Sequence, residues 1–175
     1  DDFSFPTSVA VHPRTGLIYV CDTANRRVVV RDQEGQYRFA IATSGRVPIE
    51  VACAPFSAFS PAANEIEFTR CYYPGYCAID DTRDELYVTD TTHHCVLVFP
   101  TEPKRSPADG TLVGGSLLRQ FGSRGSAEGQ FHCPKGIAFN PLTSEVVVSD
   151  SLNNRLQVFL RSGQFSRAYG CVGSK

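Results

Sequence analysis

The chain has 175 residues, of which 42% are hydrophobic and 20% are charged, and its formal net charge is −1. These values are typical of an ordinary globular domain and exclude a strong overall field that would attract nucleic acid or an anionic membrane. No apolar run approaches the roughly eighteen residues that a membrane-spanning helix needs, so we expect no membrane partner.

The first predicted unit covers about residues 5–44 and contains short strands at 9–12, 18–22, 27–32 and 38–43. Pro6 opens the unit, and its second strand ends at Asp22, sixteen residues later. The polar turn TANR follows this aspartate and leads into the third strand. Short apolar runs bounded by turn residues are typical of β-strands, and no helical period is sustained anywhere in the chain.

Residues 45–72 form a first insertion, and its stretch VPIEVACAPFSAF is too apolar for a free linker. Cys53 and Cys71 flank this insertion and would be the first disulfide to expect in a secreted protein. The seven cysteines are an odd number with no C-x-x-C pair, which argues against a structural zinc site and favours a reducing, intracellular compartment. Cys21 and Cys77 are interpreted as small core residues.

The second unit covers 73–122, with strands at 76–80, 85–90, 95–100 and 117–122, and the polar insertion 101–116 interrupts it. Its opening proline is Pro74 and its aspartate is Asp90. The third unit covers 131–171, with strands at 136–140, 145–150, 155–160 and 166–171, and it runs from Pro134 to Asp150 with the same spacing.

A proline-to-aspartate spacing that recurs three times to the residue indicates a repeat architecture. Four short strands per repeat predict an all-β fold: one β-propeller domain over 1–175 with three four-stranded blades, half of a six-bladed ring. The first strand of each blade should line the central channel. The side chains expected to be buried between blades or around the axis are Val9, Val11, Ile18, Val20, Ile137, Val146 and Val148.

The third unit with its lead-in, QFGSRGSAEGQFHCPKGIAFNPLTSEVVVSDSLNNRLQVFLRSGQF, resembles an NHL repeat. That pattern has a glycine-rich lead, GQF, a proline, GIAV, a strand ending V-x-D, then N-H-R and a strand ending V-F. The N-H-R position reads Asn25-Arg26-Arg27, His93-His94-Cys95 and Asn153-Asn154-Arg155, so each copy keeps only part of it. The resemblance covers about two thirds of the chain and implies a β-propeller that binds proteins or, in some NHL propellers, single-stranded RNA.

Strand parity places the two insertions on opposite sides of the predicted propeller. In a blade of antiparallel strands, the link to the next blade leaves on the same side as the turn between the second and third strands. We therefore expect 45–72 to share a rim with the turns after Asp22, Asp90 and Asp150. The insertion 101–116 should lie on the opposite side.

The three aspartates could form a ring of carboxylates for a cation, but the blades are too far apart to share one ion. We interpret Asp22, Asp90 and Asp150 as structural residues that accept backbone N–H groups of the adjoining turns. The adjacent pair His93 and His94 does not have the alternate spacing that would place two rings on one side of a strand as metal ligands.

The amidating lyases of the peptidylglycine type are propeller enzymes with similar repeats. These bind zinc through a histidine directly after the blade-opening proline, where this chain has Thr7, Gly75 and Lys135. The chain also lacks a G-x-S-x-G elbow and the Lys-Ser/Thr of a phosphate-binding loop. We therefore expect no catalytic residue, no metal and no cofactor, and a protein that is not an enzyme.

The predicted function is a non-catalytic scaffold that binds a protein partner through the rim carrying 45–72. The alternative is single-stranded RNA binding through the same rim. Glu50, Glu65 and Glu67 in the insertion would weaken a positive patch. The candidate rim residues are Arg26, Arg27, Arg46, Tyr72, Tyr73, His93, His94, Asn153 and Arg155.

Three blades leave two apolar blade faces uncovered, a larger patch than soluble monomers tolerate. Either two copies join head to tail as a homodimer that closes a six-bladed ring, or the missing blades belong to a longer parent chain. The absence of methionine favours a fragment of a larger protein.

Overall fold

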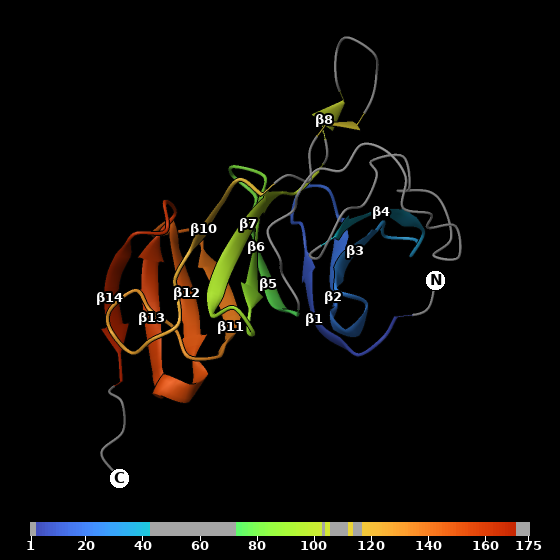
Figure 1. The fold of residues 1–175 in the computed structure, drawn as a ribbon. Helices are drawn as coiled ribbons and strands as arrows, with labels where there is room; N and C mark the ends of the chain where they lie inside the picture. Colours follow the sequence, from blue (N-terminus) through green and yellow to red (C-terminus); the bar gives the residue numbers. More distant parts are fainter. Residues whose placement is uncertain (1–2, 43–72, 103, 106–111, 114–116, 171–175) are drawn as a thin grey trace.

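The computed structural model of the chain describes residues 3–42, 73–102, 104–105, 112–113 and 117–170. In these ranges the chain forms three four-stranded antiparallel sheets and one two-stranded hairpin (Figure 1). Short 3₁₀ turns, η1 (Thr23–Asn25) and η4 (Ser151–Asn153), follow the second strands of the first and third sheets. The all-β fold class is confirmed. No helix in the described part of the chain is long and apolar enough to span a membrane.

Each sheet is one blade, with its strands joined in sequence order. Blade one contains β1 (Pro6–Val11), β2 (Ile18–Asp22), β3 (Arg27–Arg31) and β4 (Tyr37–Ala42). Blade two contains β5 (Pro74–Asp80), β6 (Glu85–Asp90), β7 (Cys95–Pro100) and β10 (Arg119–Phe121). Blade three contains β11 (Pro134–Asn140), β12 (Glu145–Asp150), β13 (Arg155–Leu160) and β14 (Phe165–Tyr169).

The first strand of each blade begins at the proline, two or three residues before the predicted start. A β-bulge explains the difference. It shifts the register after Pro6, Pro74 and Pro134, so that each proline still pairs with the aspartate at the end of the second strand. Side chains do not alternate between the two sheet faces across the bulge. The hydrophobic pattern of the sequence therefore indicates only the part of each first strand that follows the bulge.

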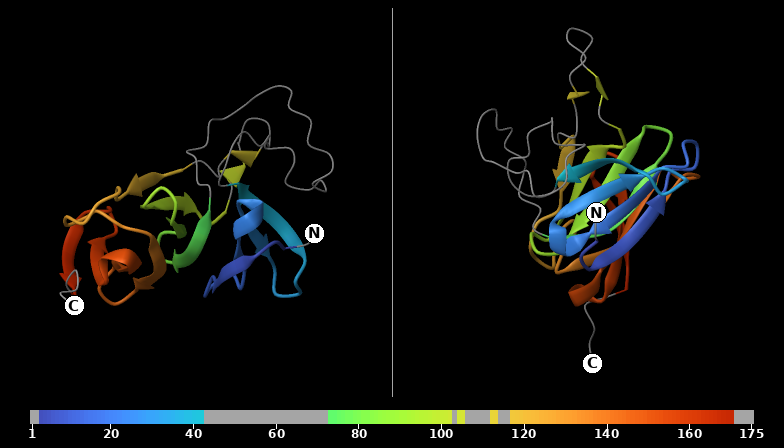
Figure 2. Two further views of the ribbon diagram at one scale, coloured as in Figure 1. Left: turned by 60° about the horizontal axis from the view of Figure 1, so that its bottom comes forward. Right: turned by 90° about the vertical axis from the view of Figure 1, so that its right-hand side faces the viewer.

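The three blades follow one another side by side (Figure 2), and their first strands β1, β5 and β11 contact one another in that order. One apolar core lies between blades one and two and includes Tyr19, Cys21 and Cys77. A second core lies between blades two and three and includes Phe121, Phe131 and Phe159. Each inner sheet face is therefore covered by the neighbouring blade, and Cys21 and Cys77 are buried as expected.

Burial differs from the prediction on the side of blade one that faces away from blade two. Val146 and Val148 are fully buried, and Ile18, Val20 and Ile137 are partly buried. The prediction was wrong for Val9 and Val11, which are 62% and 57% exposed. Alternation along β1 points Ala10 into the core, so Val9 and Val11 lie on the outer face of the blade, where no preceding blade covers them.

A hairpin of β8 (Lys104–Arg105) and β9 (Leu112–Val113) branches off between β7 and β10. It projects at the top of Figure 1, whereas the 3₁₀ turn after β12 lies at the bottom. These strands fall within the predicted insertion 101–116. The insertion 45–72 lies outside the described residues.

Candidate functional site

In blades one and three, the turn between the second and third strands lies beside the lead-in segment that precedes the blade. The Ala24 N–H donates to the Ser4 carbonyl at 3.0 Å, and the Leu152 N–H donates to the His132 carbonyl at 3.0 Å. We call this edge the turn rim: turns 23–26, 91–94 and 151–154, with lead-ins 3–5, 73 and 131–133.

Asp150 is fully buried and joins three segments of the turn rim. Its carboxylate accepts the His132 N–H at 2.7 Å, Arg155 Nε at 2.8 Å, Asn153 Nδ2 at 2.8 Å and Gln157 Nε2 at 3.0 Å. Arg155 also donates to the backbone carbonyls of Ala127 and Gln130, and Asn153 donates to the Gly125 carbonyl. Arg155 and Asn153 therefore hold the turn together.

Asp22 has the same role in blade one, and it is also fully buried. It accepts the Ser4 N–H at 2.6 Å, Asn25 Nδ2 at 2.8 Å and Arg27 Nε at 2.7 Å. The ion pair with Asp22 orients the Arg27 side chain back toward its own turn. In both blades the carboxylate binds the lead-in, eighteen residues before it, as well as the turn after it.

Asp90 serves a different set of donors, because the turn of blade two has histidines at this point. Its carboxylate accepts the Thr92 N–H at 3.0 Å, the His93 N–H at 2.9 Å and His93 Nδ1 at 2.7 Å. His93 thus takes the place of the asparagine in the other two turns, while its ring remains partly exposed.

The last residue of each turn has a left-handed backbone: φ is 55° at Arg26, 58° at His94 and 54° at Asn154. His94 Nδ1 accepts the Cys133 N–H at 3.0 Å, and its ring meets His132 edge to face at 5.6 Å. Burial, reinforced by the Arg124 charge, lowers the pKa of His94. The neutral ring is the form that accepts this hydrogen bond between blades two and three. Arg26 is exposed at the equivalent point of blade one.

Of the predicted rim residues, Arg26, Tyr73 and His93 present surface on the turn rim. Arg46 and Tyr72 lie outside the described residues. Two large apolar side chains that sequence reasoning did not select are also exposed there: Phe5 in a lead-in and Leu152 in a turn. Phe5 could have been found from the sequence, because it is an aromatic residue directly before the proline that opens a blade, like Tyr73. Exposed cations on this side that were likewise not selected are Arg124 and Lys135.

Among the described residues, no group of three or more His, Cys, Asp and Glu side chains could hold a metal ion. The Thr7 hydroxyl, directly after the proline of blade one, donates to the Gly75 carbonyl at 2.5 Å and so joins blades one and two. Lys135 is exposed at the equivalent point of blade three.

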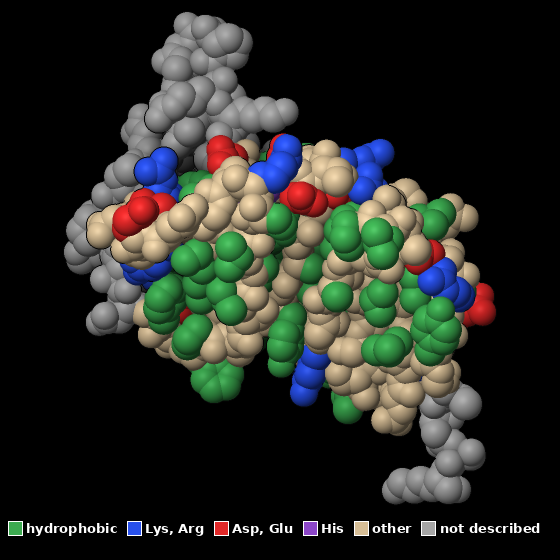
Figure 3. Space-filling view, turned by 180° about the vertical axis from the view of Figure 1, so that it is seen from behind, with side chains coloured by type: hydrophobic (Ala, Val, Ile, Leu, Met, Phe, Trp, Pro, Cys, Tyr) green, Lys and Arg blue, Asp and Glu red, His purple; other side chains and the backbone are tan. Residues whose placement is uncertain are grey.

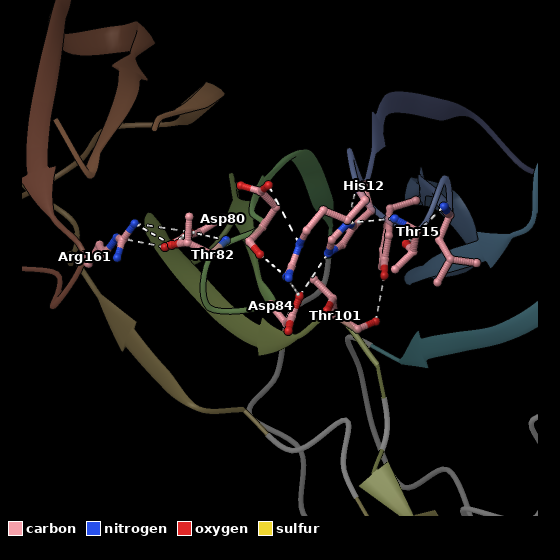
Figure 4. Close-up of polar contacts among 11 residues, drawn as sticks. His12, Thr15, Asp80, Thr82, Asp84, Thr101 and Arg161 are labelled. Carbon is pink, nitrogen blue, oxygen red and sulfur yellow. Dashed lines mark hydrogen bonds and ion pairs between the residues drawn. The ribbon is translucent and has the colours of Figure 1, made fainter. Parts of the chain in front are cut away.

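A line of polar contacts crosses the opposite edge of the molecule and connects all three blades (Figure 4). Arg161 of blade three forms an ion pair with Asp80 of blade two at 2.9 Å and donates to the Thr82 hydroxyl at 2.7 Å. The buried His12 contacts Asp84 through Nε2 at 3.2 Å, and backbone N–H groups donate to its Nδ1. These contacts fasten neighbouring blades to one another at the edge opposite the turn rim.

Residues 3–30 match the family model of the NHL repeat, which confirms the resemblance for blade one. The protein brain tumor of Drosophila melanogaster is 38% identical over 56 residues, which cover 32% of this chain and 5% of that protein.

Solved structures show the same fold over nearly the whole chain. A nidogen/laminin complex has a TM-score of 0.59 at 12% identity over 95% of this chain, streptogramin B lyase has 0.57 at 13% over 96%, and the RRP9 WD40 repeats have 0.59 at 15% over 96%. The β-propeller fold is confirmed. The chain spans only 48%, 41% and 39% of those three chains.

Proposed function

We propose that this chain is a non-catalytic interaction scaffold that binds a protein partner through the turn rim and the adjoining insertion 45–72. The proposal rests on the exposure of Phe5, Tyr73 and Leu152 on the turn rim. The arginines Arg27 and Arg155 on the same rim are bound to the buried aspartates of their own turns. Large apolar and aromatic side chains with an arginine nearby are the residues that dominate protein interfaces.

The comparisons are compatible with this proposal at the level of fold. One solved structure with this fold is a nidogen/laminin complex, which is an assembly of two proteins. Another is a lyase, so the fold alone does not decide between binding and catalysis. Catalysis by the turn rim is disfavoured because Asp150, His93 and His94 hold the turns and the contact between blades two and three.

The test is affinity capture with the chain as bait, compared between wild type and Phe5→Ala/Tyr73→Ala/Leu152→Ala by quantitative mass spectrometry. Truncation of central interface side chains typically costs about 2 kcal/mol or more each, so a partner of the rim should fall at least tenfold. Leu142→Ala, on the exposed β11–β12 turn at the opposite edge, is the matched control and should capture the partner fully. Equal thermal unfolding curves would show that the variants are folded.

Deletion of 45–72 tests the second half of the proposed surface. A partner that survives both the deletion and the triple substitution would place binding elsewhere and overturn the assignment of the turn rim.

Single-stranded RNA is the second candidate, because the cations Arg26, Arg124 and Lys135 and the aromatic side chains of Phe5 and Tyr73 are all exposed. The net charge of −1 weighs against it. Filter binding to mixed single-stranded RNA separates the two candidates, since RNA binding would weaken steeply with added salt and with Arg26→Ala. No retention at low salt would remove RNA from consideration.

A further inference from the structure

Two cysteine side chains from different blades share the core between blades one and two. Cys21 belongs to β2 and Cys77 to β5, and both are thiols in the structure. Both are members of the same apolar core, where Cys21 is 0% and Cys77 is 6% exposed. In the space-filling view of Figure 3, apolar side chains reach the surface over both halves of the molecule, but Cys21 and Cys77 lie beneath the surface.

The contacts of Cys77 reach across to blade one at the position of Cys21. The Cys77 sulfur lies 3.9 Å from the Ser8 hydroxyl, and Ser8 is the residue opposite Cys21 in the β1–β2 ladder. The Cys77 thiol also donates to the Tyr19 carbonyl at 3.9 Å, and Tyr19 lies two residues before Cys21 with its side chain in the same core. The backbone N–H of Cys77 donates to the Ser8 hydroxyl at 3.3 Å. These contacts hold Cys77 next to Cys21.

The two thiols also interact with each other. A hydrogen bond from the Cys21 thiol lowers the pKa of Cys77 below its ordinary value of 9.0, while burial opposes the lowering and the Ser8 hydroxyl adds to it. Cys95 of the same core differs, because burial and the charge of Asp90 raise its pKa to about 12. Since the thiolate is the form that reacts with oxidants, Cys77 is better suited to react than Cys95.

The equivalent place between blades two and three contains no pair of thiols. The repeat spacing aligns Cys21 with Thr89 of blade two and Cys77 with Ile137 of blade three. There the Thr89 hydroxyl donates to the Lys135 carbonyl at 3.0 Å, and Ile137 packs against the core. An interface of the same kind therefore forms with a hydroxyl and an isoleucine at this place, so packing between blades does not require two thiols.

From these contacts we infer that Cys21 and Cys77 form a site of oxidative modification, at which a peroxide converts the two thiols into a disulfide between blades one and two. The Cys77 sulfur attacks one peroxide oxygen, the O–O bond breaks, and the departing hydroxide takes the proton of the Cys77 thiol, which leaves a sulfenic acid and water. The Cys21 sulfur then attacks the Cys77 sulfur, the S–O bond breaks, and the second hydroxide leaves as water with the proton of the Cys21 thiol. The two sulfurs together lose two electrons, which reduce hydrogen peroxide to two molecules of water.

The disulfide would close a loop from Cys21 to Cys77, which in the sequence includes β3, β4 and the insertion 45–72. A crosslink across a loop of this length restricts the unfolded chain and typically stabilises the folded one. The modification would thus strengthen the junction between blades one and two, and a dithiol would reverse it. The inference does not depend on the partner that the turn rim binds.

Mapping the disulfide tests the inference directly. The folded chain is treated with hydrogen peroxide, the remaining thiols are blocked with N-ethylmaleimide, and the chain is digested without reductant by trypsin and chymotrypsin, because cleavage after Tyr76 separates Cys77 from Cys71. Mass spectrometry should find the peptide of Cys21 joined to that of Cys77, and a dithiol should separate them. The inference is wrong if both residues remain thiols, if they become separate sulfinic acids, or if either joins another cysteine.

Thermal unfolding of oxidised and reduced protein tests the consequence for the fold. Oxidised wild type should unfold about 5–10 °C above the reduced protein. Cys21→Thr and Cys77→Ile introduce the residues that the neighbouring repeats have at these positions, and neither variant should show this difference. Cys133→Ser, which removes a half-buried thiol of the turn rim, is the matched control and should keep it. A midpoint of wild type that does not rise on oxidation, or a rise that persists in either core variant, would overturn the inference.

Discussion

At the scale of single residues, Asp150 shows how much of a blade can depend on one carboxylate. It is fully buried and satisfies donors from the lead-in, the turn and the third strand. Its removal would leave a backbone N–H and an arginine without their acceptor inside the protein. Asp32 is a useful contrast, because it accepts a single N–H, that of Gln36, in the β3–β4 turn.

We therefore expect Asp150→Ala to lower the free energy of unfolding by about 3–5 kcal/mol, the cost of leaving buried charged partners unpaired. Asp32→Ala should cost about 1 kcal/mol, the value of one ordinary hydrogen bond. Urea unfolding followed by circular dichroism measures both. Equal losses in the two variants would contradict the structural role assigned to Asp150.

Glu85 gives the stability a defined dependence on pH. Hydrogen bonds from Arg119, together with that from Tyr87, hold the pKa of Glu85 below its ordinary value of 4.5. The unfolded chain therefore binds this proton more readily, and the stabilisation is present above pH 4.5 and is lost as the pH falls through the folded-state pKa.

The difference in unfolding free energy between wild type and Glu85→Gln should thus be about 1–3 kcal/mol at neutral pH and should shrink below pH 4.5. Denaturant unfolding at a series of pH values checks it, and subtracting the variant removes the contribution of other carboxylates such as Glu145. If the difference in unfolding free energy between wild type and Glu85→Gln grew as the pH fell, the lowered pKa of Glu85 would be contradicted.

Sequence patterns are most informative for residues whose neighbours in the chain determine their role. Asp22, Asp90 and Asp150 were selected as turn residues because an aspartate at a strand end binds nearby N–H groups. The bonds to the Ser4 and His132 amides were not foreseen, since they join segments eighteen residues apart across a β-bulge. The candidate rim residues Arg27 and Arg155 follow from their position alone, which does not reveal that a buried carboxylate binds each of them.

At the scale of elements, the contact between a lead-in and the preceding blade can be tested at Gly122. Its φ of +86° and the Phe131 ring against it both exclude a side chain. Gly35 in the β3–β4 turn has a similar φ of +78°, but a Cβ there would meet no atom within 4 Å.

Gly35→Ala should therefore cost about 1 kcal/mol through backbone strain alone. Gly122→Ala should lower the free energy of unfolding by about 1–3 kcal/mol more than Gly35→Ala does, because it also displaces the Phe131 ring from the core between blades two and three. Thermal unfolding measures the two variants side by side. Similar midpoints would mean that the ring moves aside freely.

The strands themselves were predicted well, because short apolar runs between turn residues mark them without reference to the rest of the fold. Burial was predicted less well. Val9 of β1 and Val148 of β12 both lie in apolar strands, and the sequence pattern does not distinguish them. Only Val148 packs against a neighbouring blade. Whether a strand face is covered depends on the next element in space, and the local pattern does not contain that information.

At the scale of the whole molecule, the repeat spacing was enough to predict propeller blades and their order. It predicted the fold class because a shared spacing forces a shared strand register, and the three sheets pair in the same way from proline to aspartate. The contacts that fasten the blades, such as Arg161 with Asp80, join residues from different repeats. No single repeat contains both partners, so these contacts appear only when the blades are placed together.

The insertion of Phe131 into the preceding blade gives the junction of blades two and three a direction, because the aromatic side chain of the lead-in points backward onto Gly122, beside the last strand of blade two. Two like edges of a blade cannot make this contact, so it fixes the order in which blades two and three follow one another. The angle between these blades is set by the side chains of the core that they share.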